Sequence, residues 1–92
     1  MDKINNLNQT VELMLSEDYK ERFIAEYVQV KIRAFRIARV LNRVVDKSAP
    51  DYFETTCSFD VLAEQLYYMA NYLSVLENRS LIENIDLPEV EI

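Results

Sequence analysis

The sequence predicts an all-α protein in which two long helices form an antiparallel hairpin and a short N-terminal helix is the third element. Three observations support this prediction. Apolar residues recur every three or four positions over long stretches, which is typical of one face of an α-helix. Little interrupts these stretches, because the chain has only 2 Pro and no Gly. Without Gly, the turns that most often join β-strands are also absent. We therefore expect one helical domain over residues 1–92.

The first predicted helix spans about residues 3–14. Ile4, Leu7, Val11 and Met14 follow one another at steps of three, four and three, which places them on one helical face. A helix this short is marginal by itself and needs a larger partner to bury that face. We expect it to dock on the two long helices.

The second predicted helix spans about residues 17–46. Ser16 is its expected N-cap, and Glu17 and Asp18 place negative charge at the positive end of the helix dipole. The apolar residues then alternate between steps of four and three at Phe23, Tyr27, Val30, Ala34, Ile37, Leu41 and Val44. A flanking set widens this stripe, namely Ile24, Val28, Phe35 and Ala38. Such a broad stripe predicts contact with more than one neighbouring element.

A loop over about residues 47–58 precedes the third predicted helix, which spans about residues 59–84. Pro50 and several polar turn-forming residues interrupt the apolar periodicity in the loop. Ser58 is the expected N-cap of the helix, whose apolar face lies at Leu62, Leu66, Met69, Leu73 and Leu76. Asn84 and Pro88 end the helix, and we expect a frayed tail over residues 85–92.

The third helix has a second apolar line, roughly 100° around the helix axis from the first. Its members are Val61, Tyr68, Tyr72, Val75 and Ile82. Two long helices joined by a short loop run antiparallel, and such a hairpin cannot bury two broad stripes alone. The sequence therefore predicts a helical-bundle homo-oligomer, either a symmetric dimer or a larger ring.

The composition disfavours most kinds of enzyme. Without His or Gly, the chain has neither the commonest general base and metal ligand nor a Gly-rich phosphate loop. Its 1 Cys cannot form an intramolecular disulfide or a multi-cysteine metal site. The N-terminus lacks the pattern of a signal peptide, and no apolar run reaches the roughly 18 residues of a membrane span. We expect a cytoplasmic, non-enzymatic protein with no catalytic residue, metal, cofactor or membrane partner.

Charge is distributed unevenly along the chain, whose formal net charge is −6. Residues 17–47 contain eight basic and five acidic side chains, whereas residues 48–92 contain nine acidic side chains and one basic side chain, Arg79. Arg36, Arg39 and Arg43 share one helical face, and Arg33 extends this patch by one turn. The patch is either a solvated surface that pairs with the acidic helix, or a site for phosphate or for a carboxylate-rich partner. Duplex nucleic acid is disfavoured as a partner because the chain as a whole is acidic.

Three tyrosines, Tyr67, Tyr68 and Tyr72, lie within two turns of the third helix. A tyrosine combines a flat apolar ring with a hydroxyl that tolerates contact with water, so the group suits a subunit interface. If that interface also leaves a cleft rimmed by arginines, the stacking rings and guanidinium groups suit a nucleotide or cyclic dinucleotide. The candidate ligand-binding residues are therefore these tyrosines together with Arg33, Arg36, Arg39 and Arg43.

Two stretches of the chain, LSEDYKERFIAEYVQVKIR at Leu15 to Arg33 and LAEQLYYMANYLSVLENRSLIENIDL at Leu62 to Leu87, support a family resemblance. They are similar to a family of short proteins in phages and prophages of gut bacteria, related to a protein of crAss-like phage. The resemblance implies a phage accessory protein with no catalytic residues to carry over. Because small acidic helical phage proteins are often counter-defence factors, we expect sequestration of a small phosphorylated immune signal, a cyclic nucleotide, at subunit interfaces.

Two other functions remain open from the sequence. The acidic third helix could inhibit a host defence protein by occupying a basic groove, in which case Glu77 and Glu83 are the residues to test. A structural or assembly role in the phage particle is the other alternative.

Overall fold

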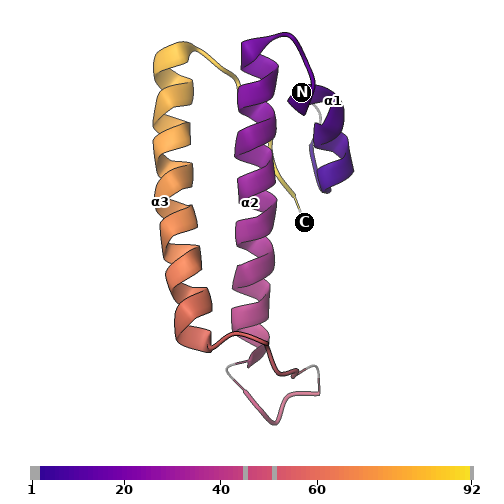
Figure 1. Ribbon diagram of the computed structural model, residues 1–92, viewed down its shortest axis with the longest axis vertical. Helices are drawn as coiled ribbons and strands as arrows, with labels where there is room; N and C mark the ends of the chain where they lie inside the picture. Colours follow the sequence, from indigo (N-terminus) through magenta and orange to yellow (C-terminus); the bar gives the residue numbers. More distant parts are fainter. Residues whose placement is uncertain (1–2, 45, 51, 92) are drawn as a thin grey trace.

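The architecture is a long antiparallel hairpin with a small N-terminal unit packed on one side. The computed structural model describes residues 3–44, 46–50 and 52–91. Its elements are the 3-10 helix η1 (Leu7–Thr10) and the α-helices α1 (Val11–Met14), α2 (Tyr19–Val44) and α3 (Phe59–Glu83). α2 stands between α1 and α3 (Figure 1). The predicted all-α class is confirmed: within these residues the regular structure is helical and no strand forms.

Side-chain caps fix the ends of the long helices. α2 begins at Tyr19, two residues later than the sequence predicts, because Ser16 and Asp18 form a capping turn. The Ser16 hydroxyl accepts from the Asp18 backbone N–H at 3.0 Å, and the Asp18 carboxylate accepts from the Lys20 N–H at 2.9 Å. Ser58 caps α3 as predicted. Asn84 ends α3 in the left-handed region at φ 55°, which asparagine tolerates better than most residues.

The N-terminal segment differs from the predicted helix over residues 3–14. Asn6 is extended, and it forms a capping box with Gln9, so that helical structure starts only at η1. Ile4 forms a parallel β-bridge with Val90 instead. The Ile4 N–H donates to the Glu89 carbonyl at 3.0 Å, and the Glu91 N–H donates to the Ile4 carbonyl at 2.9 Å.

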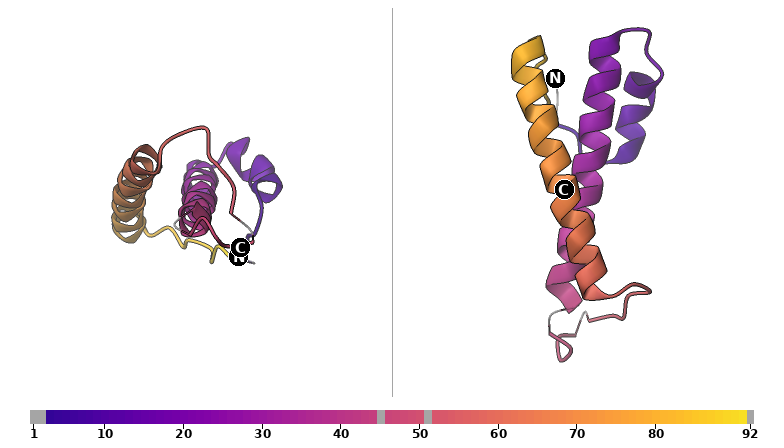
Figure 2. Two further views of the ribbon diagram at one scale, coloured as in Figure 1. Left: turned by 90° about the horizontal axis from the view of Figure 1, so that it is seen from below. Right: turned by 60° about the vertical axis from the view of Figure 1, so that its left-hand side comes forward.

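The C-terminal segment, residues 85–91, is also ordered, whereas the sequence predicts a frayed tail. After α3 it crosses α2 and reaches the N-terminal segment (Figure 2). Ile85 and Pro88 are buried, and Leu87 and Val90 pack against the core. Its order depends on this burial and on the bridge to Ile4, both of which need the folded hairpin.

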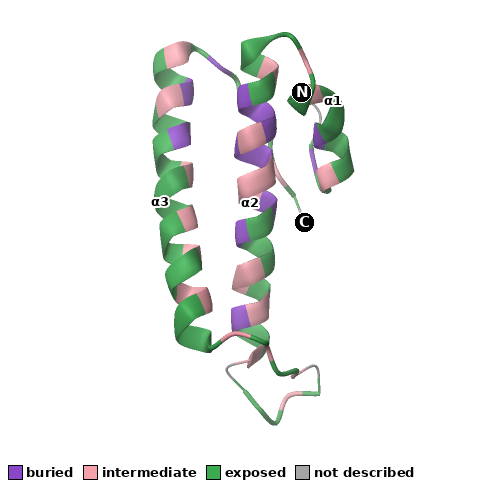
Figure 3. Ribbon diagram, in the orientation of Figure 1, coloured by how far each residue is buried: buried purple, intermediate pink, exposed green. Residues whose placement is uncertain are grey.

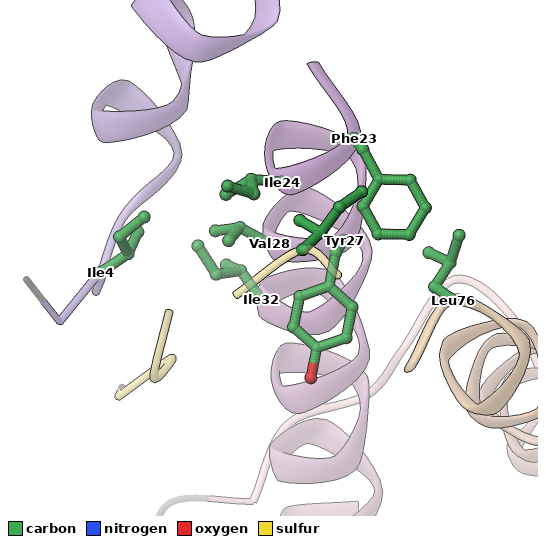
Figure 4. Close-up of a cluster of buried hydrophobic side chains, with 8 residues drawn as sticks. Ile4, Phe23, Ile24, Tyr27, Val28, Ile32 and Leu76 are labelled. Carbon is green, nitrogen blue, oxygen red and sulfur yellow. The ribbon is translucent and has the colours of Figure 1, made fainter. Parts of the chain in front are cut away.

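The core is centred on the N-terminal half of α2. Figure 3 shows buried positions concentrated there, while most of α3 is exposed. Phe23 and Tyr27 lie toward Leu76 of α3, whereas Val28 and Ile32 lie toward Ile4 (Figure 4). Val28 and Ile32 are 0% exposed. The broad stripe of α2 therefore packs on two neighbours, α3 on one side and the N-terminal segment on the other. No helix in the described part of the chain is both long and apolar enough to cross a membrane.

Two polar clusters join α2 to α3. In the first, the Tyr19 hydroxyl donates to the Glu83 carboxylate at 2.9 Å, and Arg79 donates to both, at 2.5 Å to Tyr19 and 3.1 Å to Glu83. The Arg79 guanidinium also lies 4.8 Å from the centre of the Phe23 ring. In the second, Tyr27 donates to Glu77 at 2.8 Å, and the Lys31 ammonium lies 3.8 Å from the same carboxylate. These contacts fix the register of the two helices.

The first cluster predicts a dependence of stability on acid. The hydrogen bond from Tyr19, assisted by Arg79, lowers the pKa of Glu83 below its ordinary value of 4.5. A carboxyl with a lowered pKa in the folded state stabilises the fold above the ordinary value and loses that contribution as the pH falls. As the pH falls below 4.5, we therefore expect the melting temperature of Glu83→Gln to decrease less than that of the wild-type protein.

The measurement is the melting temperature at a series of pH values by circular dichroism. Glu17→Gln is the matched control, because the Glu17 side chain is exposed and makes no ion pair or hydrogen bond among the described residues. Identical acid profiles for Glu83→Gln and wild type would contradict the assignment.

Candidate functional site

Arg36, Arg39 and Arg43 form an exposed group on α2 that we name the arginine face. Phe23 and Tyr27, which contact side chains of α3, start a line along α2 that continues through Ala34 and Leu41. At 100° per residue, the arginine face lies on the opposite side of the helix from this line. It also lies beyond the half of α2 that the N-terminal segment covers. The three guanidinium groups are thus placed away from α3.

A hollow of about 340 Å³ lies beside the arginine face, between α2 and the C-terminal segment. Its lining consists of Phe35, Ala38, Arg39, Asn42, Val90 and Glu91. The Phe35 side chain is 37% exposed, and the Lys31 ammonium lies 6.0 Å from the centre of its ring. The hollow therefore combines a guanidinium group, a side-chain amide, an accessible aromatic ring and a carboxylate.

Each of these groups has a chemical use in holding a nucleotide. A guanidinium binds phosphate through paired hydrogen bonds, and an aromatic ring stacks on a base. An amide both donates and accepts, and a carboxylate accepts from ribose hydroxyls or an exocyclic amine. The hollow can thus accept a ligand with one anionic part and one flat part, provided that the phosphate lies toward Arg39 and away from Glu91.

The sequence-based prediction included Arg39 but missed the other polar and aromatic members of this hollow. The sequence pattern places Phe35 in the apolar stripe of the second helix, although its position one turn before Arg39 already brings ring and guanidinium together. Val90 and Glu91 reach α2 only through the ordered C-terminal segment. No periodicity of the sequence indicates that arrangement.

The three predicted tyrosines lie on α3. Tyr67 and Tyr68 are each 64% exposed, and their rings meet edge to face with centroids 5.4 Å apart. The Tyr72 hydroxyl donates to the carboxylate of Glu26 on α2. Arg33 lies two helical turns after Glu26, so it shares this side of the hairpin with Tyr68 and Tyr72. Within one copy of the chain, therefore, the structure groups Arg33 with tyrosines and the arginine face with Phe35.

Other parts of the molecule are less suited to an anion. A hollow of about 500 Å³ between the N-terminal segment and α2 is lined by Lys3 but also by Glu12 and Glu21. Among the described residues, no group of three or more His, Cys, Asp or Glu side chains is placed to hold a metal ion. Burial raises the pKa of Tyr27, and the hydrogen bond to Glu83 raises that of Tyr19, so both phenols stay protonated at neutral pH.

Comparison with known families places the hairpin in a group of related proteins. A model of the Sequestin family matches residues 17–82. The chain belongs to the Sequestin family. The match covers α2 and all of α3 except Glu83 in this Sequestin, and it includes all seven predicted site residues along with Phe35 and Asn42. The family name describes a sequestering protein, which suggests binding rather than catalysis. No curated protein and no solved structure matches the Sequestin chain.

Proposed function

We propose that this Sequestin is a non-enzymatic binding protein that sequesters a small phosphorylated ligand of the cyclic-nucleotide class. In this proposal it acts for a phage as a counter-defence factor, removing an immune signal from the cytoplasm of the host cell. Family membership supports the sequestering role, and the resemblance of Leu15 to Arg33 and Leu62 to Leu87 to short phage proteins supports the viral context.

The observation that most supports a phosphorylated ligand is the hollow beside the arginine face. Arg39 lines the hollow, and Arg36 and Arg43 lie within one turn of it on the same face. Phosphate binds through the guanidinium groups of Arg39 and Arg36, and the base stacks on Phe35. Because Phe35 supplies the ring, the tyrosines are available for the other role considered from the sequence, a subunit interface.

Self-association is part of the proposal. Tyr68 and Tyr72 lie exposed on the α3 side of the hairpin, and exposed aromatic side chains are enriched at interfaces. A homo-oligomer would carry several copies of the arginine face and would hold several ligands at once.

The alternative of inhibition through an acidic surface has less support. Glu77 is bound by Tyr27 and Lys31, and Glu83 is bound by Tyr19 and Arg79. These two carboxylates hold α2 against α3, so they are less available to a basic groove on a host enzyme.

The test is binding of defined nucleotides to the purified protein. A panel of cyclic dinucleotides, cyclic trinucleotides and cyclic ADP-ribose isomers is titrated by calorimetry and by thermal melting. A ligand present at 100 times its Kd stabilises the folded state by about 2.7 kcal/mol. For a domain of this size that corresponds to a rise in melting temperature of roughly 10 °C or more. Denaturing the complex should release the nucleotide chemically intact.

Two results would contradict the proposal. Flat calorimetry and unchanged melting across the panel would exclude cyclic-nucleotide binding. Recovery of a hydrolysed nucleotide would indicate an enzyme instead of a sequestering protein.

A further inference from the structure

One side of the hairpin presents two parallel lines of side chains at heptad spacing. On α3 the steps alternate between four and three through Val61, Gln65, Tyr68, Tyr72, Val75, Arg79 and Ile82. On α2 the same alternation runs through Glu26, Val30, Arg33, Ile37, Val40 and Val44. The hydrogen bond between Tyr72 and Glu26 shows that the two lines lie on the same side of the molecule. We name this surface the heptad face.

The apolar members of the heptad face are left open by the chain itself. Val61, Tyr68, Tyr72, Val75 and Ile82 are 42–73% exposed. The apolar members on α2 are half-buried. Arg79 is directed away from the face, because its guanidinium lies over the Phe23 ring. Alternating four-three spacing is the pattern by which one helix packs its side chains between those of another helix.

Charge at the edges of the heptad face indicates what covers it. The Tyr72 contact places residues 26 and 72 at one height along the antiparallel helices. Arg33 lies seven residues after Glu26 on α2, and Gln65 lies seven residues before Tyr72 on α3, so these two residues are again at one height. Glu64 is the neighbour of Gln65. Arg33 and Glu64 are both exposed, and among the described residues neither makes an ion pair. An unpaired cation and an unpaired anion at the same height suit a second copy of the same surface.

We propose that a second copy of this chain packs on the heptad face, related by a two-fold axis parallel to the helices. This symmetry places α2 of each subunit over α3 of the other and keeps all heights unchanged. Arg33 then faces Glu64 of the partner subunit, and the reverse pair forms by symmetry. The result is a four-helix bundle whose inner layer contains the heptad lines of both copies.

The size of the heptad face agrees with this occupant. Helix α3 has 25 residues and is therefore about 37 Å long. Two helices packed side by side are about 20 Å wide, so the face covers on the order of 700 Å². Stable dimers bury about 800 Å² on each partner. The arginine face remains outside this interface, because it lies on the side of α2 turned away from α3.

The dimer specifies the self-association that is part of the proposed function. It rests on the proposed function for self-association and not for nucleotide binding. Its test uses protein without nucleotide, so failure of ligand binding and failure of association are distinguished. Sedimentation equilibrium of the full chain should give the mass of two 10.9 kDa subunits. A monomer mass at every concentration, or a stoichiometry other than two, would overturn the proposal.

Matched substitutions locate the interface. Val75→Lys introduces a charge into the heptad face and should raise the dissociation constant of the dimer at least 100-fold, as expected for an unpaired charge at the centre of an interface. Leu81→Lys introduces the same charge on another side of α3, where Leu81 is 79% exposed, and should leave the dimer intact. Circular dichroism verifies that both variants are folded. Equal effects of the two substitutions would exclude the heptad face.

A charge swap tests the symmetry. Arg33→Glu and Glu64→Arg should each weaken the dimer about 10-fold or more, and the double variant should recover most of the loss. Additive losses in the double variant would show that these two residues do not face each other, and the parallel two-fold axis would be wrong.

Discussion

Replacing Arg39 by alanine is expected to weaken binding of the cyclic nucleotide about 10- to 100-fold. Among the four predicted arginines, only Arg39 lines the hollow beside Phe35. A hydrogen bond to a charged group contributes about 1.5–3 kcal/mol, which corresponds to this range of affinity. Calorimetric titration of the wild-type ligand into Arg39→Ala gives the change directly.

The control is Arg22→Ala in the same helix. Arg22 is exposed and lies 17 residues before Arg39, about 25 Å along the axis. Its guanidinium donates to the Ser16 carbonyl at 2.8 Å, far from the hollow. Equal loss of affinity in the two variants would indicate a general effect of net charge, and the site beside Phe35 would have to be abandoned.

Replacing Leu76 by alanine is expected to destabilise the protein by about 2–5 kcal/mol. Leu76 is 1% exposed and is the residue of α3 that enters the buried cluster. Truncation of a buried leucine removes its transfer free energy and leaves a cavity. A small domain has only about 5–15 kcal/mol of net stability, so this one change removes a large part of it.

Urea unfolding followed by circular dichroism measures this loss. Leu81→Ala is the comparison, because Leu81 lies in the same helix but is 79% exposed, and its change should stay within about 0.5 kcal/mol. If Leu76→Ala cost no more than Leu81→Ala, the packing of α3 against α2 described above would be incorrect.

The hairpin could be predicted from the sequence because its information is local. The four-three spacing from Phe23 to Val44 and from Leu62 to Leu76 specifies amphipathic helices, and Ser58 and Asn84 mark the ends of α3. The start of α2 is harder to predict from the sequence, because Ser16, Glu17 and Asp18 are all acceptable near a helix N-terminus. Only the hydrogen bonds of Ser16 and Asp18 decide that the helix begins at Tyr19.

The surroundings of the candidate site could be predicted only in part. Arg36, Arg39 and Arg43 share a helical face by simple periodicity, and the structure exposes all three. The hollow also requires Val90 and Glu91, which reach α2 because Ile4 pairs with Val90 across nearly the whole chain. A single β-bridge between distant residues has no periodic signal, since it depends on the packed helices that bring its two partners together.

The bridge between Ile4 and Val90 has a consequence for biosynthesis. During synthesis, Ile4 can acquire its partner only after Val90, far along the sequence, has left the ribosome. The two helices of the hairpin are complete before Val90 emerges, so closure of the hollow lined by Val90 follows formation of the hairpin. A nascent or C-terminally nicked chain would thus contain the arginine face without the wall that completes its hollow.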